Sequence, residues 1–160
     1  MAARVSGRFT AALIVLSDRA AAGTRRDECL PVMREGLGDA YEIVREIVIA
    51  DDPSRLQAEI VDLADSCAAS LVITSGGTGL SPRDRTPQAT LAVVDYEVPG
   101  IGEAIRAASI PHVRTAMLSR AVAGVRNRTL VVNLPGSPSA VAESLAVIVS
   151  VLPHALELLA

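Results

Sequence analysis

Residues 70–87 read SLVITSGGTGLSPRDRTP, and this stretch does most to decide the fold of the 160-residue chain. Its first part, residues 70–73, is apolar and predicts a buried strand. Three glycines within four residues follow, and they allow a sharp turn whose backbone N–H groups come close to a ligand. Pro87 suits the first turn of a helix, whose N-terminus attracts anions. The stretch therefore predicts a strand, a glycine turn and a helix around a phosphate or nucleotide site.

Two charged residues add chemistry to this turn. Arg83 offers a bidentate donor for a phosphate group, and Asp84 offers a hard oxygen ligand for a divalent metal. Two plainer interpretations stay open. Asp84 could instead form an ion pair with Arg83 or Arg85, and the glycines could form an ordinary strand-to-helix turn, because a short glycine motif alone is a weak signal.

Apolar runs alternate with segments of helical period on both sides of this stretch. The predicted strands are residues 11–16, 43–49, 71–74 and 129–133. The predicted helices are residues 27–37, 53–66, 87–95, 100–109 and 137–159, the last broken near Pro153. Asp52 and Thr86 are candidate N-caps, and residues 110–128 are expected to form short strands and loops. The alternation predicts an α/β fold with a mostly parallel sheet.

The chain shows no repeat, low-complexity tract or long linker, which predicts one domain over residues 1–160 with a flexible tail at residues 1–9. The short polar N-terminus lacks an apolar signal region, and residues 145–152 are too few to span a bilayer, so we expect no membrane association. Cys29 and Cys67 lack CxxC or zinc spacing, which favours a reduced, cytoplasmic protein.

The composition narrows the function further. Half of the residues are hydrophobic but only one Phe and two Tyr are present, so the core is expected to consist of Val, Ile, Leu and Ala. The net charge of −3 and the scarcity of aromatic side chains argue against nucleic-acid binding. The chain contains no lysine, so Arg, backbone N–H groups or a metal must hold any phosphate.

Polar residues follow each predicted strand, where ligands bind in open α/β sheets. The loops are residues 17–19, 51–52, 75–84 and 134–137. Asp51 and Asp84 each closely follow a strand, and two carboxylates with ligand phosphates make a common Mg²⁺ site. Asp51 or Asp52 could instead cap the next helix, which is the favoured role of Asp52, and Asp18 could bind a ligand or cap a turn.

Residues near the end of the chain add further candidates. Asn133 and Gly136 flank a second tight turn whose backbone could approach a ligand. Ser119 and Arg120 could supply hydroxyl and guanidinium contacts, although Arg120 could equally be solvated. The two histidines, at positions 112 and 154, have no partner at metal-ligand spacing and are expected to be non-catalytic.

Several motifs resemble those of the molybdenum cofactor biosynthesis family of molybdopterin-binding proteins. They are SGGTG and PRDRTP within residues 75–87, EVPGIGE at 97–103, MLSR at 117–120 and VNLPGSP at 132–138, with LSDR at 16–19 and LPHAL at 152–156. The likeness runs from about Ala11 to Leu159. Because several ordered motifs match at the right spacing, it is specific.

The resemblance implies a three-layer α/β/α sandwich that assembles as a homotrimer or hexamer. It also implies Mg²⁺-dependent transfer of AMP from ATP to the terminal phosphate of molybdopterin, with release of pyrophosphate and hand-over of the product to a molybdate-insertion protein. By matching motifs, Asp51 and Asp84 fall on the catalytic, metal-holding carboxylates. The candidate ligand-binding residues are Ser17, Asp18, Ser75, Gly76, Gly77, Thr78, Gly79, Arg83, Ser119, Asn133, Pro135, Gly136 and Ser137.

Two other functions are compatible with this fold. One is a non-catalytic molybdopterin-binding paralogue or scaffold, against which the presence of both Asp51 and Asp84 speaks. The other is a nucleotide-processing hydrolase of the competence-damage type. Those proteins usually carry paired acidic residues after the glycine loop, whereas this chain has Pro-Arg-Asp-Arg at residues 82–85. We therefore expect an adenylyltransferase.

Overall fold

A mostly parallel sheet forms the centre of the molecule in a computed structural model, which describes residues 4–5 and 8–160. Within those residues the sheet has seven strands. They are β1 (Arg4–Val5), β2 (Arg8–Leu16), β3 (Tyr41–Ile49), β4 (Leu71–Ser75), β5 (Tyr96–Glu97), β6 (Ala123–Arg126) and β7 (Thr129–Leu134).

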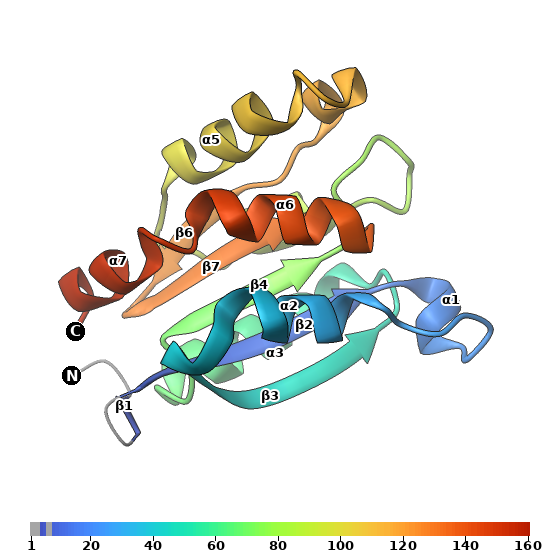
Figure 1. Ribbon diagram of the computed structural model, residues 1–160. Coiled ribbons are helices and arrows are strands. Elements are labelled where there is room, and N and C mark those ends of the chain that lie inside the picture. The colour runs from blue at the N-terminus through green and yellow to red at the C-terminus, as the bar shows by residue number, and fades with distance from the viewer. Residues whose placement is uncertain (1–3, 6–7) are drawn as a thin grey trace.

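The order of the strands brings four carboxyl ends to one edge. Strand β2 pairs in parallel with β3 on one side and with β4 on the other, and β4 pairs in parallel with β7. Strands β6 and β5 extend the sheet in antiparallel fashion beyond β7, and β1 pairs antiparallel with the start of β2. The loops after β2, β3, β4 and β7 therefore meet at the same edge (Figure 1).

Helices cover both faces of the sheet. The α-helices are α1 (Asp18–Ala21), α2 (Cys29–Leu37), α3 (Pro53–Asp65), α4 (Thr86–Leu91), α5 (Pro99–Ser109), α6 (Pro138–Ile148) and α7 (Leu152–Leu158), and the 3₁₀ helices are η1 (Gly38–Ala40) and η2 (Arg114–Leu118). Helices α2, α5, α6 and α7 lie on the face toward the viewer in Figure 1, and α3 lies behind the sheet.

The core consists of two aliphatic clusters separated by the sheet. Leu13 of β2 belongs to the cluster under α2, α6 and α7, whereas its neighbour Ile14 belongs to the cluster under α3 and α4. Every residue of β2 after Arg8 is buried, as expected for a parallel strand covered on both faces. The structure thus confirms the predicted α/β fold with three layers and a mostly parallel sheet.

The four predicted long strands are present, and β2 begins three residues earlier than predicted, at Arg8. Part of the predicted tail at residues 1–9 therefore pairs in the sheet, as β1 does. Residues 1–3 and 6–7 lie outside the described residues. The predicted helix at 87–95 ends early, at Leu91, because the chain turns there and the N–H of Asp95 pairs with Val125 of β6.

The predicted capping residues differ in outcome. Asp52 caps α3, since its Oδ1 accepts the N–H groups of Ser54 and Arg55 at 3.0 and 3.2 Å. The prediction for Thr86 was wrong, because Thr86 is the first residue of α4 and its buried hydroxyl has no hydrogen-bond partner among the described residues.

The long C-terminal helix is broken as predicted. Helix α6 ends at Ile148, and α7 begins at Leu152 with Pro153 in its first turn, where proline is tolerated. Of the residues that the structure describes, no single helix has the length and apolar character of a membrane span. Helices α6 and α7 have that length and apolar character only when they are counted together, and a bend of 61° separates them.

Candidate active site

Gly76 joins the ends of three strands. Its φ of +101° is a conformation that favours glycine, and its N–H donates to the carbonyl oxygen of Leu134 at 3.1 Å. A Cβ on Gly76 would collide with the carbonyl oxygen of Leu16. The end of β4 is thereby packed between the ends of β2 and β7, and the loops that follow them share one floor.

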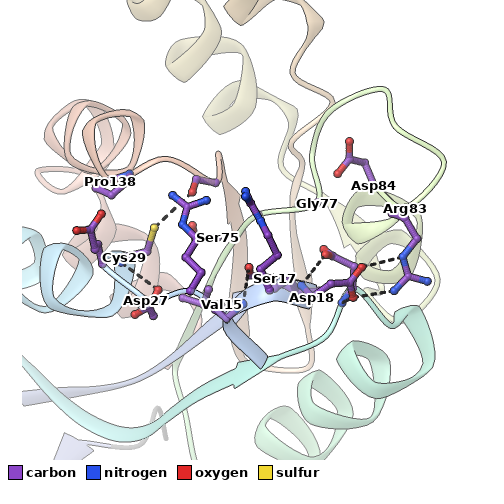
Figure 2. Close-up of a pocket in the computed structure, with 18 of the residues that line it drawn as sticks. Val15, Ser17, Asp18, Asp27, Cys29, Ser75, Gly77, Arg83, Asp84 and Pro138 are labelled. Atoms are coloured by element: carbon purple, nitrogen blue, oxygen red, sulfur yellow. Dashed lines mark hydrogen bonds and ion pairs between the residues drawn. The ribbon is translucent and has the colours of Figure 1, made fainter. Parts of the chain in front are cut away.

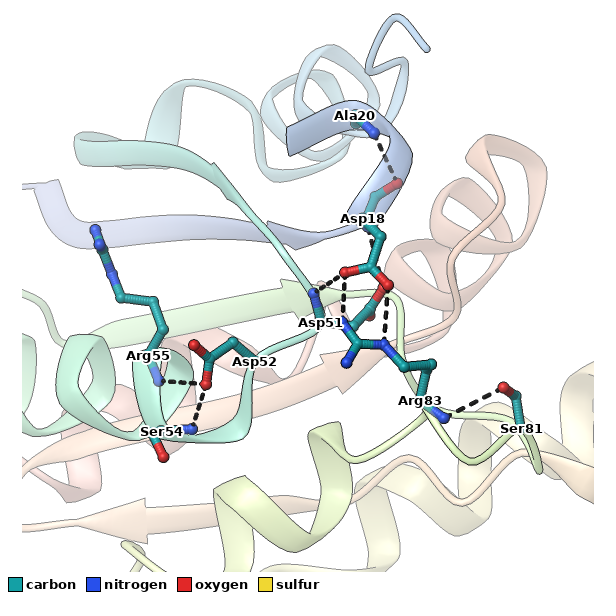
Figure 3. Close-up of polar contacts among 9 residues, drawn as sticks. Asp18, Ala20, Asp51, Asp52, Ser54, Arg55, Ser81 and Arg83 are labelled. Carbon is teal, nitrogen blue, oxygen red and sulfur yellow. Dashed lines mark hydrogen bonds and ion pairs between the residues drawn. The ribbon is translucent and has the colours of Figure 1, made fainter. Parts of the chain in front are cut away.

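Asp18 ties together the loops after β2, β3 and β4, as Figure 3 shows. Its Oδ1 accepts the N–H of Asp51 at 2.9 Å, and in return Oδ2 of Asp51 accepts the N–H of Asp18 at 3.1 Å. Arg83 donates two hydrogen bonds to Asp18, from Nε to Oδ2 at 3.0 Å and from Nη2 to Oδ1 at 2.7 Å. The carboxylate of Asp18 thus stabilises the arrangement of these loops and also lines the cavity above them, and its predicted ligand binding stays a prediction.

The pKa of Asp18 is lowered and the pKa of Asp51 is raised. The hydrogen bond from Arg83 is the largest of the causes that lower the pKa of Asp18, followed by the Asp51 N–H. Burial raises the pKa of Asp51, and the negative charges of Asp18 and Asp84 act in the same direction. Asp51 is therefore a carboxylate whose charged form a nearby cation would stabilise.

The loop after β4 brings Asp84 back toward the glycines. Oδ2 of Asp84 accepts the N–H of Ser81 at 2.9 Å. A Cβ on Gly79 would lie 2.9 Å from the same oxygen, and one on Gly77 would lie 3.3 Å from Oδ1 of Asp51. The absence of side chains at these two glycines thus leaves room for both carboxylates.

A cavity of about 380 Å³ opens over this cluster. Figure 2 shows Asp18, Arg83 and Asp84 on one side of it, and Asp27, Cys29 and Pro138 on the other. Its lining is dominated by charged side chains and glycine backbone: Asp18, Arg19, Arg25, Arg26, Asp27, Glu28, Asp51, Arg83 and Asp84, with Gly76, Gly77 and Gly136. This charged cavity suits a ligand that carries several ionised groups together with a cation.

A second cavity, of about 450 Å³, is also lined by part of the glycine loop. It is lined by Thr78, Gly79, Ser109, Val113, Thr115, Ala116, Leu118, Ser119, Pro135, Ser137, Ser139, Ala140 and Glu143. Glu143 is the one charged residue in this set, and hydroxyl and apolar groups make up most of the rest. Gly76 and Gly77 line the first cavity and the next two residues, Thr78 and Gly79, line the second, so ligands in the two cavities would contact adjacent parts of the glycine loop.

Comparison with known proteins identifies the family. The domain family described as "Probable molybdopterin binding domain" matches residues 12–154. The chain belongs to this family. This agrees with the resemblance that its motifs indicated.

Similar proteins support the assignment over most of the chain. The molybdopterin adenylyltransferase of Escherichia coli strain K12 is 41% identical over 136 residues, which are 83% of this chain and 70% of that protein. The molybdopterin adenylyltransferase of Helicobacter pylori strain 26695 is 38% identical over 147 residues, 89% of this chain and 83% of that protein. The crystal structure of the molybdopterin biosynthesis enzyme MoaB from Thermus thermophilus superposes with a TM-score of 0.89 at 43% identity, covering 94% of this chain and 96% of that one.

The predicted site residues of this molybdopterin-binding domain line two different cavities. The charged cavity is lined by Ser17, Asp18, Asp51, Ser75, Gly76, Gly77, Arg83, Asp84 and Gly136. The second cavity is lined by Thr78, Gly79, Ser119, Pro135 and Ser137. Several of these residues also stabilise the local fold: Ser17 and Ser137 cap α1 and α6, and Ser75 Oγ donates to the carbonyl oxygen of Pro135 at 2.8 Å.

Asn133 differs from its prediction, because it lines neither cavity. Its side chain is buried, and Nδ2 donates to the hydroxyls of Thr74 and Thr90 at 3.0 Å each. Its Oδ1 accepts the N–H of Val122 at 3.4 Å. Asn133 thus connects β4, β7 and α4 beneath the site.

The carboxylates fit a metal that is also held by a phosphate ligand. Asp51 and Asp84 each keep one oxygen that accepts no hydrogen bond among the described residues, and both line the charged cavity. Across residues 4–5 and 8–160, no group of three or more His, Cys, Asp or Glu side chains is placed to hold a metal by itself. Two carboxylates are the protein ligand set typical of Mg²⁺ bound with substrate phosphates.

The sequence analysis missed three residues that line the charged cavity. Arg25 and Arg26 lie in the loop after α1, and Cys29 opens α2 beside the carbonyl oxygen of Gly136, 3.5 Å from its Sγ. Burial raises the pKa of the Cys29 thiol. The two adjacent arginines are a signal that could have been recognised, but their place in the lining of the charged cavity depends on the path of a loop that has no local signature.

Proposed function

We propose that this protein is a molybdopterin adenylyltransferase, which transfers AMP from ATP to molybdopterin and releases pyrophosphate. The observation that carries the proposal is the meeting of Asp51, Asp84 and Arg83 at one cavity that shares the glycine loop with a second cavity. Two cavities that meet at one loop suit a reaction between two bound substrates. The likeness to the adenylyltransferases of two bacteria supports the same activity.

The residues suit a phosphate attacking the α-phosphorus of ATP. The attacking phosphate is already ionised, so neither a covalent nucleophile nor a dedicated base is needed. The main obstacle is the approach of two anions, which positive charge and N–H groups overcome. Arg83 and the backbone N–H groups of residues 77–79 would bind the phosphates, and Asp51 and Asp84 would hold Mg²⁺, which neutralises phosphate charge when bound.

The two cavities differ in a way that suggests how they divide the substrates. The charged cavity carries four arginines beside its carboxylates, as a triphosphate with a divalent cation requires. The second cavity offers hydroxyl and apolar groups with one carboxylate, which suits a flat, uncharged ring system with hydrogen-bonding edges. We therefore place the triphosphate in the first cavity and the pterin ring in the second.

Further parts of the proposal come from the family resemblance. We expect a homotrimer or hexamer, a cytoplasmic location and transfer of the adenylylated pterin to a molybdate-insertion protein. The alternative function is a paralogue that binds molybdopterin without turnover, and the paired carboxylates favour the enzyme. These remain predictions.

Replacement of Asp84 by Asn tests the proposed site. The change keeps the size of the side chain but removes its charge, so we expect adenylylation to fall by at least about a hundredfold while molybdopterin binding stays within about twofold. Product is measured as adenylylated pterin and pyrophosphate, and binding by calorimetry. Asp39→Asn is the control, because the side chain of Asp39 is exposed and has no hydrogen bond or ion pair among the described residues. Full turnover by Asp84→Asn would contradict the role of Asp84.

A further inference from the structure

Arg120 holds both ends of the loop that carries Asp84. Its Nε donates to the carbonyl oxygen of Gly79 at 2.9 Å, and its Nη2 donates to the carbonyl oxygen of Asp84 at 2.6 Å. Its backbone N–H also donates to the carbonyl oxygen of Thr78 at 2.9 Å. A residue more than thirty positions further along the chain thus closes the neck of this loop.

The loop that carries Asp84 makes few contacts with the rest of the protein. Residues 80–83 are exposed, and beyond the neck the loop is attached through the ion pair of Arg83 with Asp18. The N–H of Asp84 donates to the carbonyl oxygen of Ser81 at 2.9 Å, which fixes the shape of the loop but not its position. At the neck itself, the three bonds from Arg120 are joined by one from the N–H of Thr86 to Gly77 at 3.1 Å.

A second arginine holds the segment from which Arg120 projects. Nη1 of Arg106, on α5, donates to the carbonyl oxygens of Ala121 at 2.8 Å and Ser119 at 3.3 Å, on either side of Arg120. A Cβ on Gly102, one turn earlier on α5, would lie 2.8 Å from the same carbonyl oxygen of Ala121. The helix thus lies close against this segment, and Arg120 projects from a supported backbone.

We propose that Arg120 is a positioning residue that sets Asp84 at the distance and angle needed to hold the metal. The proposal rests on the proposed function, in which Asp84 is a metal ligand. Arginine presents its donors in a rigid planar fork, which suits two carbonyl oxygens at a fixed spacing, whereas lysine carries a compact ammonium group on a flexible stem. The guanidinium of Arg120 is therefore hydrogen-bonded within the protein rather than simply solvated, and Arg120 lines neither cavity.

The test is Mn²⁺ binding by the full-length protein, measured by electron paramagnetic resonance with Mn²⁺ alone as the probe. We expect Arg120→Met to weaken Mn²⁺ binding by about tenfold or more, the range typical of residues that orient metal ligands. Arg120→Lys should be intermediate, and it serves as the variant to measure if Arg120→Met does not fold. Arg128→Met is the matched control, since the side chain of Arg128 is exposed with no hydrogen bond or ion pair among the described residues, and should bind as the wild type does.

A double-mutant cycle separates positioning from general damage. If Arg120 acts through Asp84, then Arg120→Met should weaken Mn²⁺ binding no further once Asp84 is Asn. Additive losses, or wild-type affinity in both Arg120 variants, would overturn the positioning role. Wild-type affinity in Asp84→Asn would instead overturn the metal role within the proposed function, and this proposal with it. The two failures are therefore distinguishable.

Discussion

Single residues at the sheet edge decide whether the site can form. The tight turn at residues 76–79 was predicted from the sequence, because three glycines follow an apolar strand there. The contacts that require glycine at each of these positions were not predictable. Gly76 is required by the carbonyl oxygen of Leu16, and Gly77 by the hydroxyl of Thr86, contacts that exist only once distant segments have come together. The same holds for Asp18, whose partners Asp51 and Arg83 are 33 and 65 positions away.

Gly76→Ala tests this packing. The new methyl group would meet the backbone of Leu16, and φ at this position is +101°, so we expect a loss of about 2 kcal/mol or more in the free energy of unfolding. Gly100→Ala is the control: it lies within α5, and a Cβ there has no neighbour within 4 Å. Alanine should raise stability there by about 0.5–1 kcal/mol. Urea unfolding measures both variants, and equal stabilities would contradict the account.

Secondary-structure elements were predictable where their pattern is local. The central strands are long apolar runs, and α3 and α6 begin at a cap followed by proline. Strand β5 has only two residues, both exposed, and a Cβ on the glycine of β6 would lie 2.8 Å from the carbonyl oxygen of Tyr96. These two strands form because they pair with each other, and their sequences show no hydrophobic pattern that would predict them. Helix α1 was also missed, because its four residues are too few to show a period.

One ion pair joins two elements on the side away from the site, and its strength should depend on pH. Arg126 of β6 donates to both carboxylate oxygens of Asp65 at the end of α3, and Nδ2 of Asn127 donates to Oδ1 at 2.7 Å. These contacts, that of Arg126 first, hold the pKa of Asp65 below its ordinary value of 3.8. A lowered folded-state pKa stabilises the fold above the unfolded pKa, and this stabilisation disappears as the pH falls through the folded pKa.

We therefore expect Asp65→Asn to lower the melting temperature at neutral pH and to have a smaller effect below pH 3.8. Thermal unfolding followed by circular dichroism across the acidic range measures the difference. Asp39→Asn, at an exposed site, should show no such trend. An effect of Asp65→Asn that grows on acidification would refute the assigned direction.

The whole molecule explains why residues from four loops meet. Four parallel strands end at one edge, so Ser17, Asp51, Ser75 and Pro135 follow or end neighbouring strands although they are far apart in sequence. This convergence was predictable from the alternation of strands and helices. The division of the edge into two cavities was not, because the wall of the second is formed by η2, in the part of the chain with the weakest pattern.

The assembly is a separate prediction at this scale. Leu80, Met117 and Leu158 expose 66%, 58% and 73% of their surface, which is unusual for large apolar side chains and is consistent with contacts between subunits. Light scattering should give a mass about three or six times the 16.6 kDa of one chain. A mass of 16.6 kDa at micromolar concentration would contradict the expected trimer or hexamer.

The most direct test of the central claim is a turnover assay with purified protein, molybdopterin, ATP and Mg²⁺. We predict adenylylated molybdopterin and pyrophosphate in equal amounts, with formation of both stopping when Mg²⁺ is chelated and resuming when it is restored. Binding of molybdopterin without any product at saturating ATP and Mg²⁺ would contradict the adenylyltransferase and identify a protein that only binds the pterin.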